Sequence, residues 1–335
     1  MLKFLLFLKK HLKSGDRNLK YLTDNQLKEL KVRLKWELYE RLKDMSEVEE
    51  KSLNFLLNEL LQEVLKNTEN NNEDLFKEKE NLVFYENNLE IYNNDYINID
   101  LSKYKGFINL VITSPPYNLS IEYGQHNDSL TYEDYLKWTE KWLMKTYELL
   151  ADDGRICVNI PLDKNKNGLK SIYADFVEVA KRVGFKYQST IVWNEQNISR
   201  RTAWGSWLSA SAPYVIAPVE MIVVMYKKQW KRLRKGESTI ERNEFIEWTN
   251  GVWTFSGESK KKIGHPAPYP VELPKRCIKL FSYKDDIVLD PFLGSGTTLI
   301  SAYREGRKAI GIEIDKNYID IAIERIKKEF STLFK

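Results

Sequence analysis

The sequence predicts an α/β protein with a doubly wound, mostly parallel sheet and a helical extension at its N-terminus. From about residue 82 onwards, short apolar segments alternate with amphipathic segments of helical spacing. Such near-continuous apolar strands are typical of a parallel sheet that helices cover on both faces. Two of the strands run directly into motifs rich in polar residues, proline and glycine. Because ligands of these sheets bind at the carboxyl ends of the strands, both motifs are candidates for a functional site.

The individual elements follow from the apolar pattern. Strands are expected at 108–114, 155–161, 187–193, 220–226, 286–291 and 309–314, and helices at 132–150, 169–183, 271–282, 297–306 and 316–330. Thr131 and Asp134 form a capping pair that marks the beginning of the first of these helices.

The N-terminal part of the chain has a different pattern. Residues 1–66 are rich in Leu, Lys and Glu with helical spacing, which predicts two or three helices. Lys3 and Lys9 interrupt the first apolar run and no small-residue cleavage site follows, so we expect an amphipathic helix rather than a signal peptide. A polar, Asn-rich run over 67–74 is typical of a linker. We therefore predict a helical extension over 1–80 and one larger domain over 81–335.

Composition bounds the class of protein. A chain of 335 residues, 42% of them hydrophobic, is long enough for one large domain plus an appendage. Its net charge of +4 does not by itself imply a nucleic acid. Cys157 and Cys277 have no Cys or His at metal-ligand spacing, so neither a disulfide framework nor a metal site is expected. No segment approaches the roughly 18–20 apolar residues of a membrane span, so we expect a cytoplasmic protein without a membrane partner.

The first motif is the run from Thr113 to Asn118, Thr-Ser-Pro-Pro-Tyr-Asn, which follows a predicted strand. Proline cannot continue the ladder of hydrogen bonds, so the chain turns here and the proline carbonyls lack sheet partners. The result is a stiff group of acceptors beside an aromatic ring. It suits a planar ligand that carries an amino group, such as a nucleobase taken out of its stack. The alternative is a strand that simply ends in a Ser-Pro-Pro turn.

The second motif follows the strand that ends at Asp290. Gly294 and Gly296 permit a tight turn and the close approach of a ligand, and the amides at the beginning of the next helix favour a carboxylate or phosphate. Glu313 ends the next strand, 17 residues after Gly296, where an acid can bind both hydroxyls of a ribose. These features favour a nucleotide-type ligand over the alternative, an ordinary strand-to-helix turn.

The type of ligand follows from what the second motif lacks. Leu299 occupies the place of the third glycine of the dinucleotide fingerprint, and no Gly-Lys-Ser/Thr phosphate loop occurs. This argues against NAD and against ATP. S-adenosylmethionine carries a ribose and a carboxylate but no phosphates, and it fits the motif better.

With both motifs in view, the chain resembles the beta class of DNA amino-methyltransferases, bacterial and archaeal enzymes of restriction–modification systems. That class places its catalytic motif before its cofactor motif, as this chain does with 113–117 and 290–298. Residues 265–270, His-Pro-Ala-Pro-Tyr-Pro, match the segment before the cofactor loop, and Asp95 matches the acid that contacts the cofactor adenine. The resemblance covers about 82–330 and leaves out the N-terminal 80 residues.

The resemblance implies a methyltransferase domain over 81–335 that uses S-adenosylmethionine and no metal. It assigns catalytic roles to Ser114, Pro115, Pro116 and Tyr117. It assigns cofactor binding to Asp95, Thr113, Asp290, Phe292, Gly294, Ser295, Gly296, Thr297, Thr298 and Glu313.

Ser114 is the residue that distinguishes between target bases. Its Oγ and the Pro115 carbonyl are expected to accept both N–H groups of an exocyclic amine, which localises the nitrogen lone pair, while Tyr117 stacks on the extruded base. Positioning and oriented dipoles then supply the catalysis. Members of the class with Ser at this position mostly methylate cytosine N4, and members with Asp mostly methylate adenine N6. The His-Pro-Ala-Pro-Tyr-Pro segment also differs from the form common among adenine enzymes. We therefore expect cytosine N4, with adenine N6 as the alternative.

Two segments, 195–213 and 227–264, fall where the resemblance predicts contacts with double-stranded DNA. Basic residues there supply affinity for phosphates, not sequence choice. The DNA-binding candidates are Arg200, Arg201, Trp204, Lys227, Lys228, Lys231, Arg232, Arg234, Lys235, Lys260, Lys261 and Lys262. Without the resemblance, a solvated loop and packed tryptophans are the simpler interpretation. The N-terminal helices have three candidate roles, which are DNA binding, dimerisation and stability.

Other activities remain as alternatives. Methyltransferases of RNA or of protein glutamine more often carry Asn before the Pro-Pro pair and place the cofactor loop first, so the motif order argues against them. A DNA-binding module without activity is disfavoured by the intact motifs. We expect a monomer or homodimer and a restriction endonuclease that acts on the same DNA site without forming a stable complex.

Overall fold

The computed structural model describes residues 81–117, 130–163, 170–195, 205–213, 215, 219–258 and 268–333. The chain divides into two units, residues 1–80 and 81–335. The predicted N-terminal helices and the Asn-rich linker lie outside the described residues. No helix among the described residues combines the length and apolar character that crossing a membrane requires.

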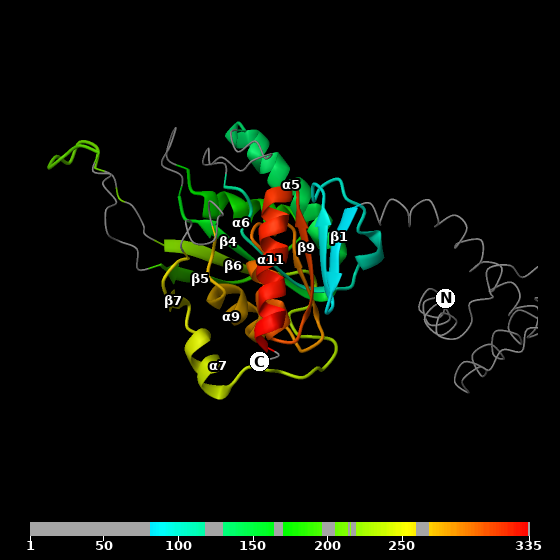
Figure 1. The fold of residues 1–335 in the computed structure, drawn as a ribbon. Coiled ribbons are helices and arrows are strands. Elements are labelled where there is room, and N and C mark those ends of the chain that lie inside the picture. Colours follow the sequence, from blue (N-terminus) through cyan, green and yellow to red (C-terminus); the bar gives the residue numbers. More distant parts are fainter. Residues whose placement is uncertain are drawn as a thin grey trace, which may run out of the picture. The chain divides into compact units, whose positions relative to one another are not determined.

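A nine-stranded sheet forms the centre of the second unit, with strand order β1-β2-β9-β8-β3-β4-β6-β5-β7 (Figure 1). The strands are β1 (Leu82–Glu86), β2 (Leu89–Asn93), β3 (Ile108–Thr113), β4 (Leu150–Pro161), β5 (Lys186–Asn194), β6 (Val219–Tyr226), β7 (Val252–Thr254), β8 (Ile287–Asp290) and β9 (Lys308–Glu313). The five central strands β2, β9, β8, β3 and β4 are mutually parallel. This confirms the predicted α/β class and its mostly parallel sheet.

The direction of β6 decides which segments share an edge of the sheet. β6 is antiparallel to both β4 and β5, so β5 runs in the same direction as β4, and β7 is parallel to β5. The carboxyl ends of β3, β4, β5, β7, β8 and β9 therefore lie at one edge of the sheet. The amino end of β6 lies at that edge too, whereas its carboxyl end lies at the opposite edge.

Helices cover both faces. They are α5 (Tyr132–Leu149), α6 (Ile172–Val183), α7 (Arg242–Trp248), α9 (Glu272–Phe281), α10 (Thr297–Arg304) and α11 (Lys316–Leu333), with a short 3-10 helix, η2 (Ser102–Tyr104). Side chains of α5 and α6, such as Trp142 and Phe176, share one core with the sheet. Those of α9, α10 and α11, such as Leu273 and Leu299, share a second core. The two cores on opposite faces correspond to the doubly wound arrangement that the alternating pattern predicts.

Each strand and helix predicted between residues 108 and 330 is present, with small shifts at its ends. Thr131 caps α5 as predicted, because its hydroxyl accepts a hydrogen bond from the Asp134 amide at 3.2 Å. Strand β4 begins at Leu150, five residues before the predicted 155–161. Strands β1, β2 and β7 and helix α7 were not expected. Strands β1 and β2 form a hairpin whose turn contains Asn87 and Asn88, both at positive φ. Asparagine in such a turn is a hairpin signal that the prediction from sequence did not use.

Candidate active site

The two sequence motifs follow neighbouring strands of the sheet, β3 and β8. β3 ends at Thr113 and its neighbour β8 ends at Asp290, both at the edge of the sheet where the parallel strands have their carboxyl ends. The Thr113 hydroxyl donates a hydrogen bond to Asp290 Oδ1 at 2.7 Å. Both side chains are buried. The structure thus brings the Ser-Pro-Pro-Tyr run and the glycine loop to one place.

Asp290 is the centre of a buried hydrogen-bond network. Its carboxylate also accepts from the Thr298 hydroxyl at 2.6 Å, from the Tyr269 hydroxyl at 3.0 Å and from the Phe292 amide at 3.1 Å. Complete burial raises the pKa of Asp290, and these donors act in the opposite direction. Thr113, Asp290 and Thr298 therefore support the glycine loop from beneath it. They do not line the pocket described next.

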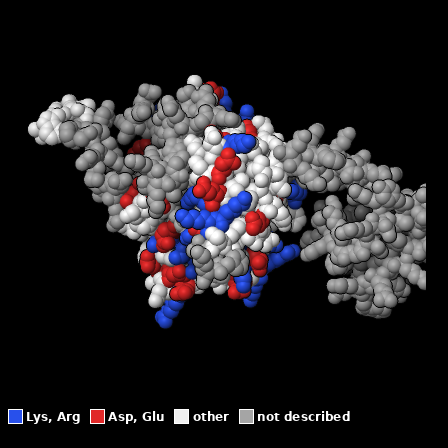
Figure 2. Space-filling model, viewed as in Figure 1, with Lys and Arg blue, Asp and Glu red and all other residues white. Residues whose placement is uncertain are grey.

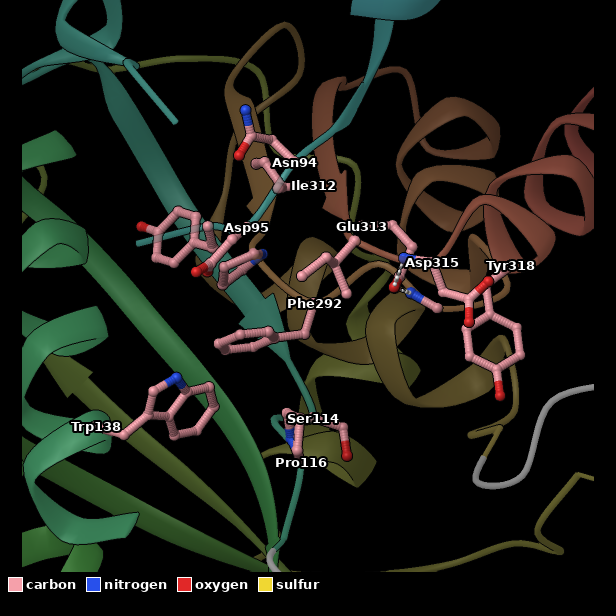
Figure 3. Close-up of a pocket in the computed structure, with 14 residues that line it drawn as sticks. Asn94, Asp95, Ser114, Pro116, Trp138, Phe292, Ile312, Glu313, Asp315 and Tyr318 are labelled. Carbon is pink, nitrogen blue, oxygen red and sulfur yellow. Dashed lines mark hydrogen bonds between the residues drawn. The ribbon is translucent and has the colours of Figure 1, made fainter. Parts of the chain in front are cut away.

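A pocket opens where these strands end, and it encloses about 820 Å³ including solvent at its mouth. The pocket is lined by Asn94, Asp95, Tyr96, Ser114, Pro116, Trp138, Pro291, Phe292, Gly294, Ile312, Glu313, Ile314, Asp315 and Tyr318. Figure 3 shows Ser114 and Pro116 toward one end of it and Asn94 and Asp95 toward the other. Residues assigned to catalysis and to the cofactor therefore face a common space.

Glu313 presents a carboxylate to this pocket from the end of β9. It accepts hydrogen bonds from the Gly294 amide at 2.7 Å and from the Asp315 amide at 2.9 Å (Figure 3). A carboxylate has about four acceptor sites, and the sites that its backbone donors leave free can accept from a ribose hydroxyl. Burial raises the pKa of Glu313, while the backbone donors act against that shift. The geometry fits the role that the sequence predicts.

The glycine loop is held against α11. Gly296 has φ +82°, and a Cβ at this position would lie 2.9 Å from the Cβ of Ala322. Arg325 of the same helix donates from Nη1 to Ser295 Oγ at 2.8 Å and to Thr297 Oγ1 at 3.1 Å. The side chains of Ser295 and Thr297 thus contact α11 and do not line the pocket. Ser295 and Thr297 instead hold the loop in place, and Gly294 of the same loop lines the pocket.

Aromatic rings form one wall of the pocket. Phe292, which the sequence predicted, lies 5.3 Å from the ring of Trp138 between centroids. Trp138 comes from α5 and was not predicted, and neither were Tyr96 and Tyr318. Asp95 lies at the far end, where its carboxylate accepts from the Ile97 amide at 3.0 Å and from Asn98 Nδ2 at 2.7 Å. The two rings are tilted by 41° to each other and give this wall of the pocket an apolar, aromatic surface.

Tyr117 differs from the expectation that its ring stands ready to stack on a base. The side chain is only 6% exposed and packs in the core on the α5–α6 face. Its hydroxyl donates to the Asn159 carbonyl at 3.1 Å and is hydrogen-bonded to the Ser114 hydroxyl. Stacking on a base would require this ring to become more exposed. Asn118, the next residue of the motif, lies outside the described residues.

The structure corrects two of the predicted DNA contacts. Lys227 is buried, and its ammonium group donates to the Leu150 carbonyl at 2.8 Å. Arg232 is half-buried and pairs with Asp153 at 3.3 Å and with Asp286 at 2.7 Å. Lys227 also lies 3.8 Å from Asp152 Oδ1, so both cations are paired within their own chain and neither is available to a phosphate.

The rest of this basic run is exposed but lies at the wrong edge. Lys228, Lys231, Arg234 and Lys235 follow the carboxyl end of β6, opposite the edge that carries Ser114. The Lys228 amide donates to the Asp152 carbonyl at the amino-terminal part of β4, at 3.0 Å. Sequence reasoning missed this because it could not tell that β6 runs antiparallel to β4.

The other DNA-binding candidates are Arg200, Arg201, Trp204, Lys260, Lys261 and Lys262, and they lie outside the described residues. The strands that precede them, β5 and β7, end at the same edge as Ser114. Within the segment 195–213, Trp207 is 64% exposed. On the face viewed in Figure 2, acidic and basic side chains of the described residues lie interspersed.

A pocket framed by the ends of two parallel strands is where open α/β sheets bind nucleotide-type ligands, the class to which S-adenosylmethionine belongs. The model of a DNA methylase family, the N6/N4 methyltransferases, matches residues 108–324. The chain therefore belongs to the N4/N6 family of DNA methyltransferases.

Individual relatives agree with this. The Type II methyltransferase M.MjaVI of Methanocaldococcus jannaschii is 63% identical over 177 residues, which cover 53% of this chain and 90% of that protein. M.ScaI of Streptomyces caespitosus, also a Type II methyltransferase, is 29% identical over 73% of this chain and 83% of its own length. The structure of TTHA0409 from Thermus thermophilus in complex with S-adenosyl-L-methionine matches with TM-score 0.58 and 26% identity, over 71% of this chain and 93% of that one. S-adenosylmethionine is the cofactor of this family, and the pocket residues described above fit it.

Proposed function

We propose that this DNA methyltransferase transfers a methyl group to the exocyclic N4 of a cytosine that is flipped out of duplex DNA. The observation that carries the proposal is the position of Ser114. It is the first residue after β3, it lines the pocket beside Pro116, and it presents a neutral hydroxyl where the adenine enzymes of this class mostly carry a carboxylate.

The residues of the chain supply acceptors for the amine. Ser114 Oγ and the Pro115 carbonyl take one N–H each, so the nitrogen lone pair turns away from the ring system and becomes a nucleophile. When bound, S-adenosylmethionine supplies the electrophilic methyl group. Ser114 is neutral and a weak base, so the amine loses its proton after transfer. Orientation and fixed dipoles are the source of rate enhancement in this scheme.

Base flipping is part of the proposal because Ser114 lies at the recessed end of a strand. A cytosine inside a duplex cannot bring its amine to such a position, so the base must leave its stack. Segment 195–213, with Arg200, Arg201 and Trp204, and the lysines at 260–262 are proposed to hold the duplex. Their phosphate contacts would give affinity that falls with salt.

The biological role we propose is protection of host DNA in a restriction–modification system, as a monomer or homodimer. Relatives named as Type II methyltransferases support this role. The matching endonuclease would act on the same DNA site and need not form a stable complex with this protein.

The target base can be determined directly. The full-length protein is incubated with duplex DNA and methyl-labelled S-adenosylmethionine, and the DNA is digested to nucleosides and separated. We expect the label in N4-methylcytosine. Label in N6-methyladenine would overturn the proposed base and favour the alternative target, and label in neither base would overturn the proposal as a whole.

A further inference from the structure

A chain of hydrogen bonds leads from Ser114 to a carboxylate at the beginning of β6. The Ser114 hydroxyl is bonded to the Tyr117 hydroxyl, which donates to the backbone carbonyl of Asn159 at 3.1 Å. Asn159 Nδ2 donates to the Tyr117 oxygen at 3.2 Å and also to Glu220 Oε2. Asn159 belongs to β4 and is 2% exposed. The antiparallel pairing of β4 and β6 brings these residues together, since Pro161 lies opposite Glu220 in the ladder.

The hydrogen bonds of Tyr117 determine the direction of the Ser114 hydroxyl proton. A tyrosine hydroxyl has a single proton, and Tyr117 gives it to the Asn159 carbonyl. Either oxygen can donate in the bond between Ser114 and Tyr117, and with the tyrosine proton directed at the Asn159 carbonyl it is Ser114 that donates. The Ser114 proton is thereby engaged, and the remaining lone pairs of its oxygen are left to accept. A serine hydroxyl that could rotate freely would instead present its proton to the amine part of the time.

Glu220 determines which way the Asn159 amide points. A carboxylate accepts hydrogen bonds only, so the Asn159 atom beside it must be Nδ2 and not Oδ1. Both Nδ2 hydrogens are then used, one for Glu220 and one for the Tyr117 oxygen. The Asn159 Oδ1 atom is buried without a hydrogen-bond partner within the described part of the chain. The amide thus keeps an orientation that leaves its own oxygen unsatisfied, as expected if Glu220 imposes that orientation.

We propose that Glu220 and Asn159 are positioning residues that hold Ser114 as a hydrogen-bond acceptor toward the target amine. This inference rests on the proposed role of Ser114. It assigns no proton transfer to Glu220, because the Asn159 amide stands between the two and an amide donor does not pass a proton along the chain. The amine proton released after transfer passes to water, since the pocket is open to solvent, and the acceptor strength of Glu220 matters more than its charge.

The test compares Glu220→Gln with Glu220→Leu. Glutamine keeps an oxygen that can accept from Asn159, whereas leucine of similar volume has none. We expect Glu220→Leu to lower the single-turnover rate of methyl transfer by about tenfold or more, and Glu220→Gln to stay within about threefold of the wild type. The dissociation constant of S-adenosylmethionine, measured by titration, and the pH profile should not change. Glu148→Leu, at an exposed glutamate on α5, is the matched control.

A double-mutant cycle separates positioning from a general loss of structure. In a Ser114→Ala background Glu220 has no hydroxyl to orient. Adding Glu220→Leu to that variant should therefore lower its single-turnover rate of methyl transfer only slightly. Asn159→Leu should behave in the same way, which covers the case in which Glu220→Leu does not fold. Additive losses would overturn the inference, as would a Glu220→Leu rate equal to the wild type. A Glu220→Gln rate as low as that of Glu220→Leu, with an altered pH profile, would also overturn it. If Ser114→Ala itself methylates at the wild-type rate, the proposed function fails instead.

Discussion

The hydroxyl of Thr113 donates a hydrogen bond to the carboxylate of Asp290 at 2.7 Å, across 177 residues of sequence. The contact joins the end of β3 to the end of β8. Ser114 directly follows the first of these two residues, and the glycine loop directly follows the second. The distance between the proposed target-base site and the cofactor loop therefore depends on two neighbouring strand ends that this hydrogen bond joins.

Removing the hydrogen bond between Thr113 and Asp290 should destabilise the domain. In Thr113→Val the shape of the side chain is kept, but the buried Asp290 loses one donor. We expect the free energy of unfolding to fall by about 1–3 kcal/mol, the cost of leaving a buried polar group short of a partner. Chemical denaturation measures the change. Thr113→Ser, which keeps the hydroxyl, should remain close to the wild type, and equal stability of the two variants would contradict the role of this contact.

Gly296 should not tolerate a side chain. Its φ of +82° is unfavourable for other residues, and an added Cβ would lie 2.9 Å from the Cβ of Ala322. Gly106 is a matched control, because it has φ +76° but nothing within 4 Å of an added Cβ. Gly106→Ala should cost about 1–3 kcal/mol for its backbone conformation alone. Gly296→Ala should cost more and should also weaken binding of S-adenosylmethionine. Equal melting temperatures for the two variants would show that α11 does not press on the loop.

Glu313 makes cofactor binding sensitive to acid. Burial raises its pKa above the ordinary value of 4.5, so the carboxylate becomes protonated at a higher pH than an exposed glutamate. Protonation removes acceptors for the ribose hydroxyls. The affinity for S-adenosylmethionine should therefore be complete above the raised pKa and fall as the pH decreases through it. Ligand-free stability should move in the opposite direction, since a raised folded-state pKa favours folding at low pH and loses that contribution as the pH rises.

Glu313→Gln provides the control for this pH dependence. The amide cannot ionise, and it offers fewer acceptors than the carboxylate. We expect affinity to drop roughly 10- to 100-fold, the range for losing a hydrogen bond to a charged group. The remaining affinity should vary less with pH than that of the wild type. The measurement is calorimetric titration of S-adenosylmethionine over a series of pH values. If Glu313→Gln lost affinity at low pH as strongly as the wild type does, another group would be responsible.

The exposed cations after β6 should have no part in DNA binding. Lys231 and Arg234 lie at the sheet edge opposite Ser114, so replacing both with Ala should leave DNA affinity and its salt dependence unchanged. Each phosphate contact contributes about 0.9 to the slope of log affinity against log salt concentration, so a double variant whose slope falls by about 1.8 would show that DNA reaches this edge after all. Arg200 and Arg201 offer the contrast, since their replacement should reduce the slope.

The parts of the site that sequence could predict are those in which a motif follows a strong strand. Ser114, Gly294 and Glu313 each stand at or just beyond the end of an apolar run, and parallel strands end at one edge. The register of the parallel strands then brings these residues to one pocket. Local pattern was sufficient to find each of these residues, because in a parallel sheet every strand end of this kind lies at the same edge.

The remaining features depend on pairings that a single sequence does not display. Trp138 reaches the pocket from the middle of α5, and helical spacing alone does not tell which buried residue faces a ligand. Asn159 and Glu220 meet only because β4 and β6 run antiparallel. The same reversal places Lys227 and Arg232 at the opposite edge of the sheet, where Lys227 is buried and Arg232 is held in ion pairs. Charge clusters in sequence were therefore the weakest guide, because burial and ion pairing depend on partners far along the chain.

The central claim is that Ser114 accepts the amine of the target base. The most direct measurement is the single-turnover rate of methyl transfer to DNA by Ser114→Ala, alongside its affinity for S-adenosylmethionine. Ser114 lines the pocket but is not among the side chains that hold the glycine loop. We predict a rate at least about a hundredfold below the wild type, as for loss of a specific transition-state contact, with cofactor affinity unchanged. A wild-type rate in Ser114→Ala would contradict the account.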